Sequence, residues 1–191
     1  AVVSADGSGT HTTVQAAALN RLDESVGIPL STFLGVLGPT GLTAYFGLLE
    51  VGKPKAGETV LVSAAAGAVG SIVGQIAKMQ GCRVVGMAGS DDKCRWLTDE
   101  LGFDAAINYK TCGDYVAAIK KACPKGVDVY FDNVGGEIFD ATLLCLNKFA
   151  RVAVCGWIST YNVPNAPGPT NLWQLVAESV TLQGFTLLDY M

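Results

Sequence analysis

Several features are missing from this chain of 191 residues, and each absence excludes a class of protein. Lys and Arg do not cluster and the net charge is −4, so a nucleic-acid-binding surface is not expected. Apolar runs are short or broken by glycine, so no segment is expected to span a membrane. No signal or transit peptide is visible, which favours a cytoplasmic protein.

Potential metal ligands are also scarce. The chain has six cysteines, no two of them form a C-x-x-C pair, and His11 is the only histidine. A zinc site needs a tighter group of ligands, so no metal site is expected. Several cysteines fall inside apolar runs, where buried free thiols are the simpler interpretation, and these fit a reducing, cytoplasmic setting.

What is present fits one folded domain behind a polar arm. Residues 1–30 are polar, with the small-residue stretch Ser4–Gly9, and are interpreted as a connector or arm. Residues 31–191 are rich in apolar residues and glycine, as is typical of a buried sheet with tight turns. Thr40 or Thr43 is expected to cap a first helix over Leu42–Glu50.

From residue 57 onward, short apolar runs alternate with segments of helical spacing. This alternation predicts parallel strands joined by right-handed crossovers, a doubly wound six-stranded α/β sheet of the Rossmann type in the order 3-2-1-4-5-6. The predicted strands are Thr59–Ala64, Arg83–Ala88, Ala105–Tyr109, Val127–Asp132, Ala150–Cys155 and Val180–Phe185. The predicted helices are Val69–Gln80, Asp91–Leu101, Tyr115–Ala122, Glu137–Leu146 and Leu172–Ser179.

The first strand runs into a glycine loop of the form A-x-x-G-x-x-G, where Ala64 replaces the usual first glycine. Gly67 lets the backbone approach a pyrophosphate, and Gly70 lets the helix pack closely on the strand. The free N–H groups of the helix N-terminus attract an anion. Because a strand precedes the loop and a helix follows it, a dinucleotide site is favoured over a turn that merely packs. Its expected phosphate-binding residues are Gly67, Ala68, Val69 and Gly70.

The end of the second strand lacks an acid. NAD-binding sites usually place Asp or Glu there for the ribose hydroxyls, whereas a carboxylate repels the 2′-phosphate of NADP. Ser90 and Lys93 follow at once and are candidates for that phosphate. Alternatively, Ser90 caps the next helix, Lys93 is a solvated charge, and Asp91 and Asp92 stabilise the helix N-terminus.

Residues after the later strands point to the same crevice, because ligands bind beyond the carboxyl ends of parallel strands. Tyr109 ends the third strand, Asn133 follows the fourth, and Cys155 to Ser159 follow the fifth. Asn133 has an alternative role as a helix cap ahead of Glu137.

Seven sequence blocks together resemble the prostaglandin reductase and leukotriene hydroxydehydrogenase branch of the medium-chain dehydrogenase/reductase superfamily, which includes curcumin reductases and alkenal double-bond reductases. The resemblance runs from about residue 30 to the end of the chain. The blocks are Leu37–Gly47, Ala64–Ser71, Ala88–Lys93, Phe103–Lys110, Tyr130–Gly136, Cys155–Asn162 and Gln183–Phe185.

This resemblance implies zinc-independent reduction, by NADPH, of the carbon–carbon double bond of an enone or enal. It further implies that Lys93 and Tyr109 bind the 2′-phosphate and that Asn133 contacts the cofactor. Cys155, Ile158 and Phe185 are then expected at the nicotinamide, and Tyr161 at the substrate carbonyl, where its hydroxyl donates to developing enolate charge. The alternative for Tyr161 is a loop tyrosine packed against the Pro-rich segment.

Members of the branch are nearly twice this long and begin with a GroES-like catalytic lobe that this chain lacks. Residues 1–191 alone are therefore expected to fold but not to turn over substrate efficiently. Two other functions stay open, an NADPH quinone reductase of the same superfamily and a nucleotide-sensing domain without turnover. The uncharged strand Val180–Phe185 is expected at a sheet edge, where it would pair with its copy in a homodimer.

Overall fold

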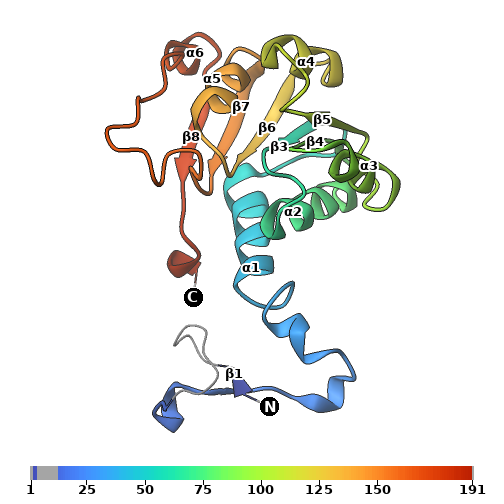
Figure 1. Cartoon of the computed structure of the whole chain (residues 1–191), viewed down its shortest axis with the longest axis vertical. Helices are drawn as coiled ribbons and strands as arrows, with labels where there is room; N and C mark the ends of the chain where they lie inside the picture. Colours follow the sequence, from blue (N-terminus) through green and yellow to red (C-terminus); the bar gives the residue numbers. More distant parts are fainter. Residues whose placement is uncertain (1, 4–12, 191) are drawn as a thin grey trace.

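The computed structural model describes residues 2–3 and 13–190, and six strands among them form one parallel sheet. The strand order is β5-β4-β3-β6-β7-β8 (Figure 1). Counted along the chain from β3, this is the order 3-2-1-4-5-6, so the predicted doubly wound α/β fold is confirmed. The strands are β3 (Thr59–Val62), β4 (Arg83–Ala88), β5 (Ala105–Asn108), β6 (Val127–Asp132), β7 (Leu146–Val154) and β8 (Thr181–Gly184).

Helices cover both faces of the sheet, because successive strand residues point to opposite sides. In β3, Val60 and Val62 belong to one apolar cluster and Leu61 to the other, and all three are fully buried. The first cluster is covered by α1 (Pro39–Phe46), α2 (Ala68–Met79) and α3 (Asp91–Asp99), and the second by α4 (Tyr115–Ala122) and α5 (Gly136–Leu143). The short α6 (Trp173–Ala177) precedes β8.

The first helix differs from the prediction. It begins at Pro39, and Gly38 is its N-cap, so the caps expected from Thr40 or Thr43 are wrong. Proline suits this first position because the helix leaves that N–H without an internal partner. The Thr43 hydroxyl instead donates a hydrogen bond of 2.7 Å to the Pro39 carbonyl inside the helix. After Phe46 the chain continues as a π-helical turn, η4 (Gly47–Gly52).

Several predicted boundaries also move. β7 begins at Leu146, which pairs with Val127, whereas the prediction ended the preceding helix at Leu146 and began this strand only at Ala150. Asn147, Lys148 and Phe149 in this stretch break the apolar run that marks the rest of the strand. The other helices and strands agree with the predictions to within two residues, apart from α5, which ends three residues early at Leu143.

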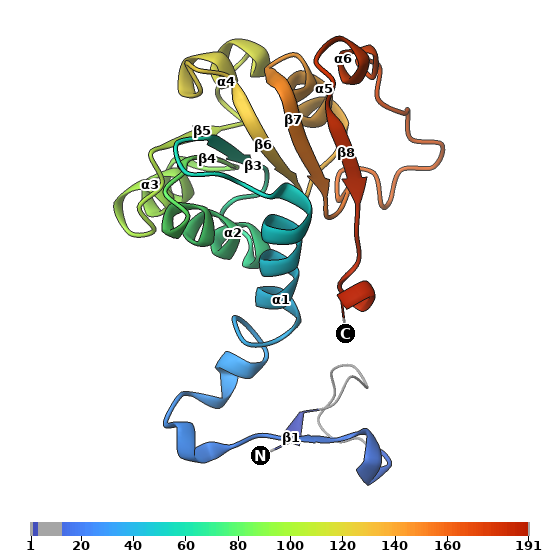
Figure 2. The ribbon, with the colours of Figure 1, turned by 180° about the vertical axis from the view of Figure 1, so that it is seen from behind.

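The N-terminal segment leads away from the sheet in both views (Figures 1 and 2). It contains a two-stranded antiparallel pair, β1 (Val2–Val3) with β2 (Asn20–Arg21), and the 3-10 turns η1 (Ala16–Ala18), η2 (Glu24–Val26) and η3 (Leu30–Phe33). The stretch Ser4–Gly9 and His11 lie outside the described residues. At the other end, η5 (Leu187–Tyr190) returns to α1, and the Tyr190 ring stacks on Phe46 at 4.7 Å between centroids.

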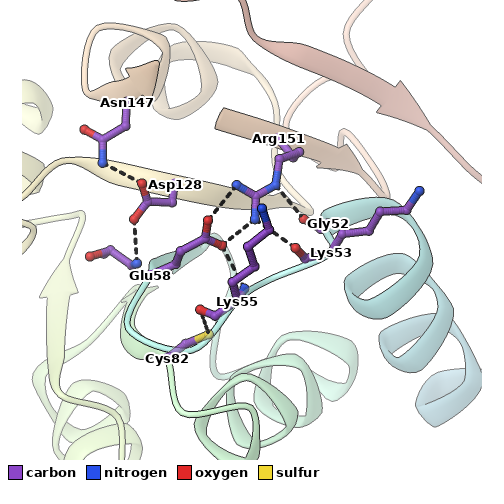
Figure 3. Close-up of polar contacts among 9 residues, drawn as sticks. Gly52, Lys53, Lys55, Glu58, Cys82, Asp128, Asn147 and Arg151 are labelled. Atoms are coloured by element: carbon purple, nitrogen blue, oxygen red, sulfur yellow. Dashed lines mark hydrogen bonds and ion pairs between the residues drawn. The ribbon is translucent and has the colours of Figure 1, made fainter. Parts of the chain in front are cut away.

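An arginine ties three elements together at the amino end of β3 (Figure 3). Arg151 of β7 donates to the carbonyls of Gly52 and Lys53, at 3.0 and 2.9 Å, where η4 ends. The same guanidinium forms a salt bridge with Glu58, just before β3. This network fixes α1 and η4 against the sheet at the edge opposite the carboxyl ends of the strands.

Candidate functional site

The glycine loop leaves β3 through a strained residue. Ala64 has φ +47°, a conformation that residues other than glycine rarely adopt. Gly67 is the N-cap of α2, and no side chain in the described part of the chain caps this helix by a hydrogen bond. Its first N–H groups are thus available to an anion. A Cβ on Gly70 would lie 2.5 Å from the Ala64 carbonyl, which confirms the predicted packing role of this glycine.

A second group of residues gathers where β4 and β5 end. Ser90 caps α3 by accepting a hydrogen bond of 3.3 Å from the Lys93 N–H, so the expected cap is confirmed. The Tyr109 hydroxyl sits against Gly89, where a Cβ would approach it to 2.7 Å. Glycine at this position thus makes room for the tyrosine. Asp91 accepts a hydrogen bond of 2.6 Å from the Asn108 amide, which gives this acid a partner outside the helix.

The end of β6 is organised by a buried carboxylate. Asp132 is fully buried and accepts hydrogen bonds from the Ser63 and Tyr130 hydroxyls and from two N–H groups of the following turn. Asn133 does not cap α5, whose N-cap is Gly135. The Asn133 side-chain amide instead donates a hydrogen bond of 2.8 Å to the Ser63 carbonyl, and this bond joins the ends of β3 and β6. The side-chain oxygen of Asn133 is left to accept from other partners.

A tryptophan shapes the turn that follows. Gly135 has φ +70°, and a Cβ there would lie 2.7 Å from the Trp157 ring, so this position requires glycine for two reasons. Trp157 also packs on Phe139 of α5, with 5.6 Å between ring centroids. The Ser159 hydroxyl donates a hydrogen bond of 2.6 Å to the Val134 carbonyl and so holds the segment after β7 over the same turn.

These loops line an open cavity of about 550 Å³ at the carboxyl ends of the strands. Four of the predicted site residues line it, namely Gly67, Lys93, Tyr109 and Ile158. The lining also includes Ser159, which the sequence placed in this crevice, and residues that sequence reasoning did not single out, among them Ala66, Tyr115, Gly135, Glu137 and Ile138. Most of these follow a strand end closely, so the rule that placed Asn133 in the crevice would also have found Gly135 and Glu137.

The other predicted residues do not line this cavity. Ala68, Val69 and Gly70 form the first turn of α2, and Ser90 and Asn133 make the contacts described above. Phe185 packs edge-on against Phe131, at 6.0 Å between centroids, and against Gly47 of η4. Tyr161 is 66% exposed, and its hydroxyl oxygen accepts a hydrogen bond of 3.1 Å from the Trp157 N–H.

Cys155 is a partly buried thiol beside Asp132. The Cys155 backbone N–H donates a hydrogen bond of 2.8 Å to the backbone carbonyl of Asp132. Burial, together with the negative charge of Asp132, raises the pKa of the Cys155 thiol to about 11, so this thiol is protonated at neutral pH. All six cysteines lie in the described part of the chain and are free.

Within the described ranges, 2–3 and 13–190, no group of three or more His, Cys, Asp or Glu side chains comes together to hold a metal ion. No helix in those ranges combines the length and the apolar character that crossing a membrane requires.

Comparisons with known proteins identify relatives for most of the chain. The family model described as "Zinc-binding dehydrogenase" matches residues 68–190. Prostaglandin reductase 1 of Bos taurus is 56% identical over 162 residues, which are 84% of this chain and 49% of that protein. The 2-alkenal reductase (NADP(+)-dependent) of Nicotiana tabacum is 51% identical over 163 residues, 85% of this chain and 48% of the relative.

A solved structure matches the fold as well. The crystal structure of CurA in complex with NADPH, from Vibrio vulnificus, superposes with a TM-score of 0.78 at 48% identity, over 83% of this chain and 48% of that one. The chain spans about half the length of the curated relatives it matches.

Proposed function

Since this chain belongs to the zinc-binding dehydrogenase family, in its prostaglandin reductase-like branch, we propose that it supplies the NADP(H)-binding domain of a reductase of α,β-unsaturated ketones and aldehydes. The carrying observation is that one cavity joins the uncapped start of α2 to Lys93 and Tyr109, beside a β4 that ends without an acid. The names of the relatives in cattle and tobacco, and the NADPH complex of CurA, support the same assignment.

The residues present fit a dinucleotide phosphate. Gly67 and the free N–H groups of α2 would receive the pyrophosphate, as a helix N-terminus receives an anion. Lys93 would pair with the 2′-phosphate, and the Tyr109 hydroxyl would donate to it. Ala88-Gly89-Ser90 brings no carboxylate to this end of β4, so the strand end itself does not repel that phosphate.

When bound, NADPH would supply the hydride that reaches the β-carbon of the conjugated double bond. The chain's own residues would position both reactants. Ile158 lines the cavity, and we place it with Cys155 and Phe185 at the nicotinamide end. Because the Tyr161 oxygen accepts the Trp157 N–H, its own proton stays free to donate to the enolate oxygen that forms in the substrate. The reaction as proposed uses no zinc.

The proposal extends to organisation and location. We assign residues 31–191 to the dinucleotide-binding domain and residues 1–30 to a connecting arm, of which the described residues 13–30 lead away from the sheet. A second lobe would complete the substrate cleft, because the relatives are about twice as long as the matched region. The six free cysteines fit a reducing compartment, and we propose the cytoplasm.

We also propose a homodimer through β8. This strand is at one end of the sheet order and is exposed along its whole length. Its sequence Thr-Leu-Gln-Gly carries no charge and no proline that would protect a free edge. Pairing of β8 with its copy about a two-fold axis would continue the sheet across both subunits.

An assay of NADPH oxidation tests the reductase function. The protein extended to the length of its relatives is given an enone, an enal and a quinone in turn, and residues 1–191 alone are assayed beside it. Efficient turnover of the enone or enal by the longer protein, with little by residues 1–191, is the expected result. Turnover of the quinone alone would instead identify a quinone reductase, and NADPH binding without any turnover would indicate a nucleotide-sensing domain.

A further inference from the structure

Two polar side chains in the cavity have no part in the function proposed so far. Tyr115 is the first residue of α4 and Glu137 lies in the first turn of α5, so they follow the carboxyl ends of β5 and β6. Both line the cavity together with Lys93 and Tyr109. Glu137 is exposed, and Tyr115 is partly buried.

The wall around these two side chains suits a flat aromatic ring with a polar edge. Ile138 is 6% exposed and presents apolar surface to the cavity next to Glu137. Burial raises the pKa of the Tyr115 hydroxyl, and the nearby Glu137, Cys112 and Tyr109 raise it further, so Tyr115 is neutral at physiological pH. A neutral phenol ring and an isoleucine offer two apolar surfaces, while the Glu137 carboxylate only accepts hydrogen bonds.

The covalent structure of the cofactor places its base here. This step rests on the proposed function, in which Lys93 pairs with the 2′-phosphate and Gly67 approaches the pyrophosphate. The adenine is attached to the ribose carbon next to the one that carries the 2′-phosphate, so it must lie at the Lys93 end of the cavity. The Tyr109 hydroxyl lies against Gly89, next to the start of the helix that carries Lys93. Tyr115 is close enough to Tyr109 and Glu137 for both to act on its hydroxyl, and all three line the cavity with Ile138.

We propose that Glu137 recognises the adenine base of the cofactor, with Tyr115 flanking the ring. The carboxylate would accept a hydrogen bond from the exocyclic N6 amino group, which carries donors only. Hypoxanthine has a carbonyl oxygen at that position, and its lone pairs would face the carboxylate. Glu137 therefore acts as a specificity-determining residue for the base, in addition to the stabilisation that an acid gives to a helix N-terminus.

The test compares two nucleotides, NADPH and its analogue with hypoxanthine in place of adenine, by calorimetric titration. The unmodified protein should bind NADPH about tenfold more tightly, the lower end of what a hydrogen bond to a charged group contributes. In Glu137→Gln this preference should fall to about twofold or less, because the amide can donate to the hypoxanthine oxygen. Glu100→Gln removes another exposed carboxylate, at the end of α3 and outside the cavity lining, and should leave the preference unchanged.

The outcomes separate this inference from the function on which it rests. Equal binding of the two nucleotides by the unmodified protein, or an unchanged preference in Glu137→Gln, would overturn adenine recognition by Glu137 and leave NADP(H) binding standing. Binding of neither nucleotide would overturn both. A role of Glu137 confined to helix stability would lower the unfolding temperature of Glu137→Gln without changing the ratio of the two affinities, and this too would reject the inference.

Discussion

At the scale of single residues, Ala64 shows how the glycine loop tolerates an imperfect sequence. The usual first glycine of this loop is replaced by alanine, yet the backbone keeps φ +47°. A left-handed conformation costs a residue with a Cβ about 1 kcal/mol. The fold retains the strained conformation because Ser63 and Ala65 on either side are fixed by backbone hydrogen bonds of 3.1 and 2.9 Å, to the carbonyls of Phe131 and Met87.

Replacing Ala64 by glycine should therefore stabilise the protein. Relief of the left-handed strain exceeds the extra freedom that glycine gives the unfolded chain, so we expect a gain of about 0.5 kcal/mol in unfolding free energy. Urea unfolding measures it. Ala66→Gly, two residues on in the same loop but without positive φ, is the matched control and should destabilise. A loss of stability in Ala64→Gly equal to that in the control would contradict the strain assigned to Ala64.

Lys93 carries the proposed cofactor preference. Lys93→Ala should weaken NADPH binding roughly tenfold, because a hydrogen-bonded charge pair with the 2′-phosphate is lost, while NADH binding should barely change. Titration with both nucleotides measures the effect. Arg95→Ala is the control, since Arg95 lies on the same helix but pairs with Asp92 outside the cavity lining. Equal weakening of both cofactors by Lys93→Ala would reject the phosphate role.

At the scale of elements, the Arg151 network should make stability depend on pH (Figure 3). Burial raises the pKa of Glu58, but hydrogen bonds from Arg151 and from the Lys55 N–H lower it more, so the net pKa is below its ordinary value of 4.5. A carboxylate with a depressed pKa contributes stability above its unfolded pKa and loses it as the pH falls through the folded value.

Glu58→Gln should thus cost about 1 kcal/mol at pH 7, because the salt bridge is only about one-fifth exposed. The difference between the two proteins should shrink as the pH falls below about 5 and through the depressed folded pKa of Glu58, because the carboxyl group is then protonated in both states. Thermal unfolding across this range measures it. A difference that stays constant with pH would show that Glu58 stabilises the fold by packing alone.

The edge strand β8 makes a prediction about assembly. Phe185 donates its N–H to Val154 of β7, and alternation along the strand turns the Leu182 N–H away from β7. Leu182→Pro should therefore dissociate the proposed dimer without breaking the sheet. Leu182→Ala keeps this N–H and should remain dimeric. Light scattering distinguishes the two, and a monomeric unmodified protein at micromolar concentration would refute the dimer.

The sequence predicts the elements of this fold better than their ends. Continuous apolar runs mark β3, β4 and β6 because these strands are buried on both faces, and the strand order follows from the crossovers. The sequence does not predict the start of β7, because Asn147 and Lys148 are polar residues within a strand. The first helix is misjudged because Pro39 and Gly41 suggest an interruption, although proline favours a helix start.

At the scale of the whole molecule, the loops after successive strands converge on one cavity. Some of the residues that line it can be predicted from the sequence and others cannot. Gly67, Lys93, Tyr109 and Ile158 are found from motifs and family resemblance, and the structure brings them together. Tyr115 and Glu137 belong to no motif. Glu137 follows the end of β6 closely, whereas Tyr115 is brought to the cavity by the packing of α4 beside α5. The same fold directs Phe185 toward η4 and Phe131, a contact between segments far apart in the sequence.

The central claim is that this cavity binds NADP(H) in preference to NAD(H). Calorimetric titration of the unmodified protein with NADPH and then with NADH tests it most directly. We predict one site per chain, with NADPH bound at least about tenfold more tightly, because Lys93 and Tyr109 meet a 2′-phosphate that NADH lacks. Equal affinity for the two nucleotides, or tighter binding of NADH, would contradict the account.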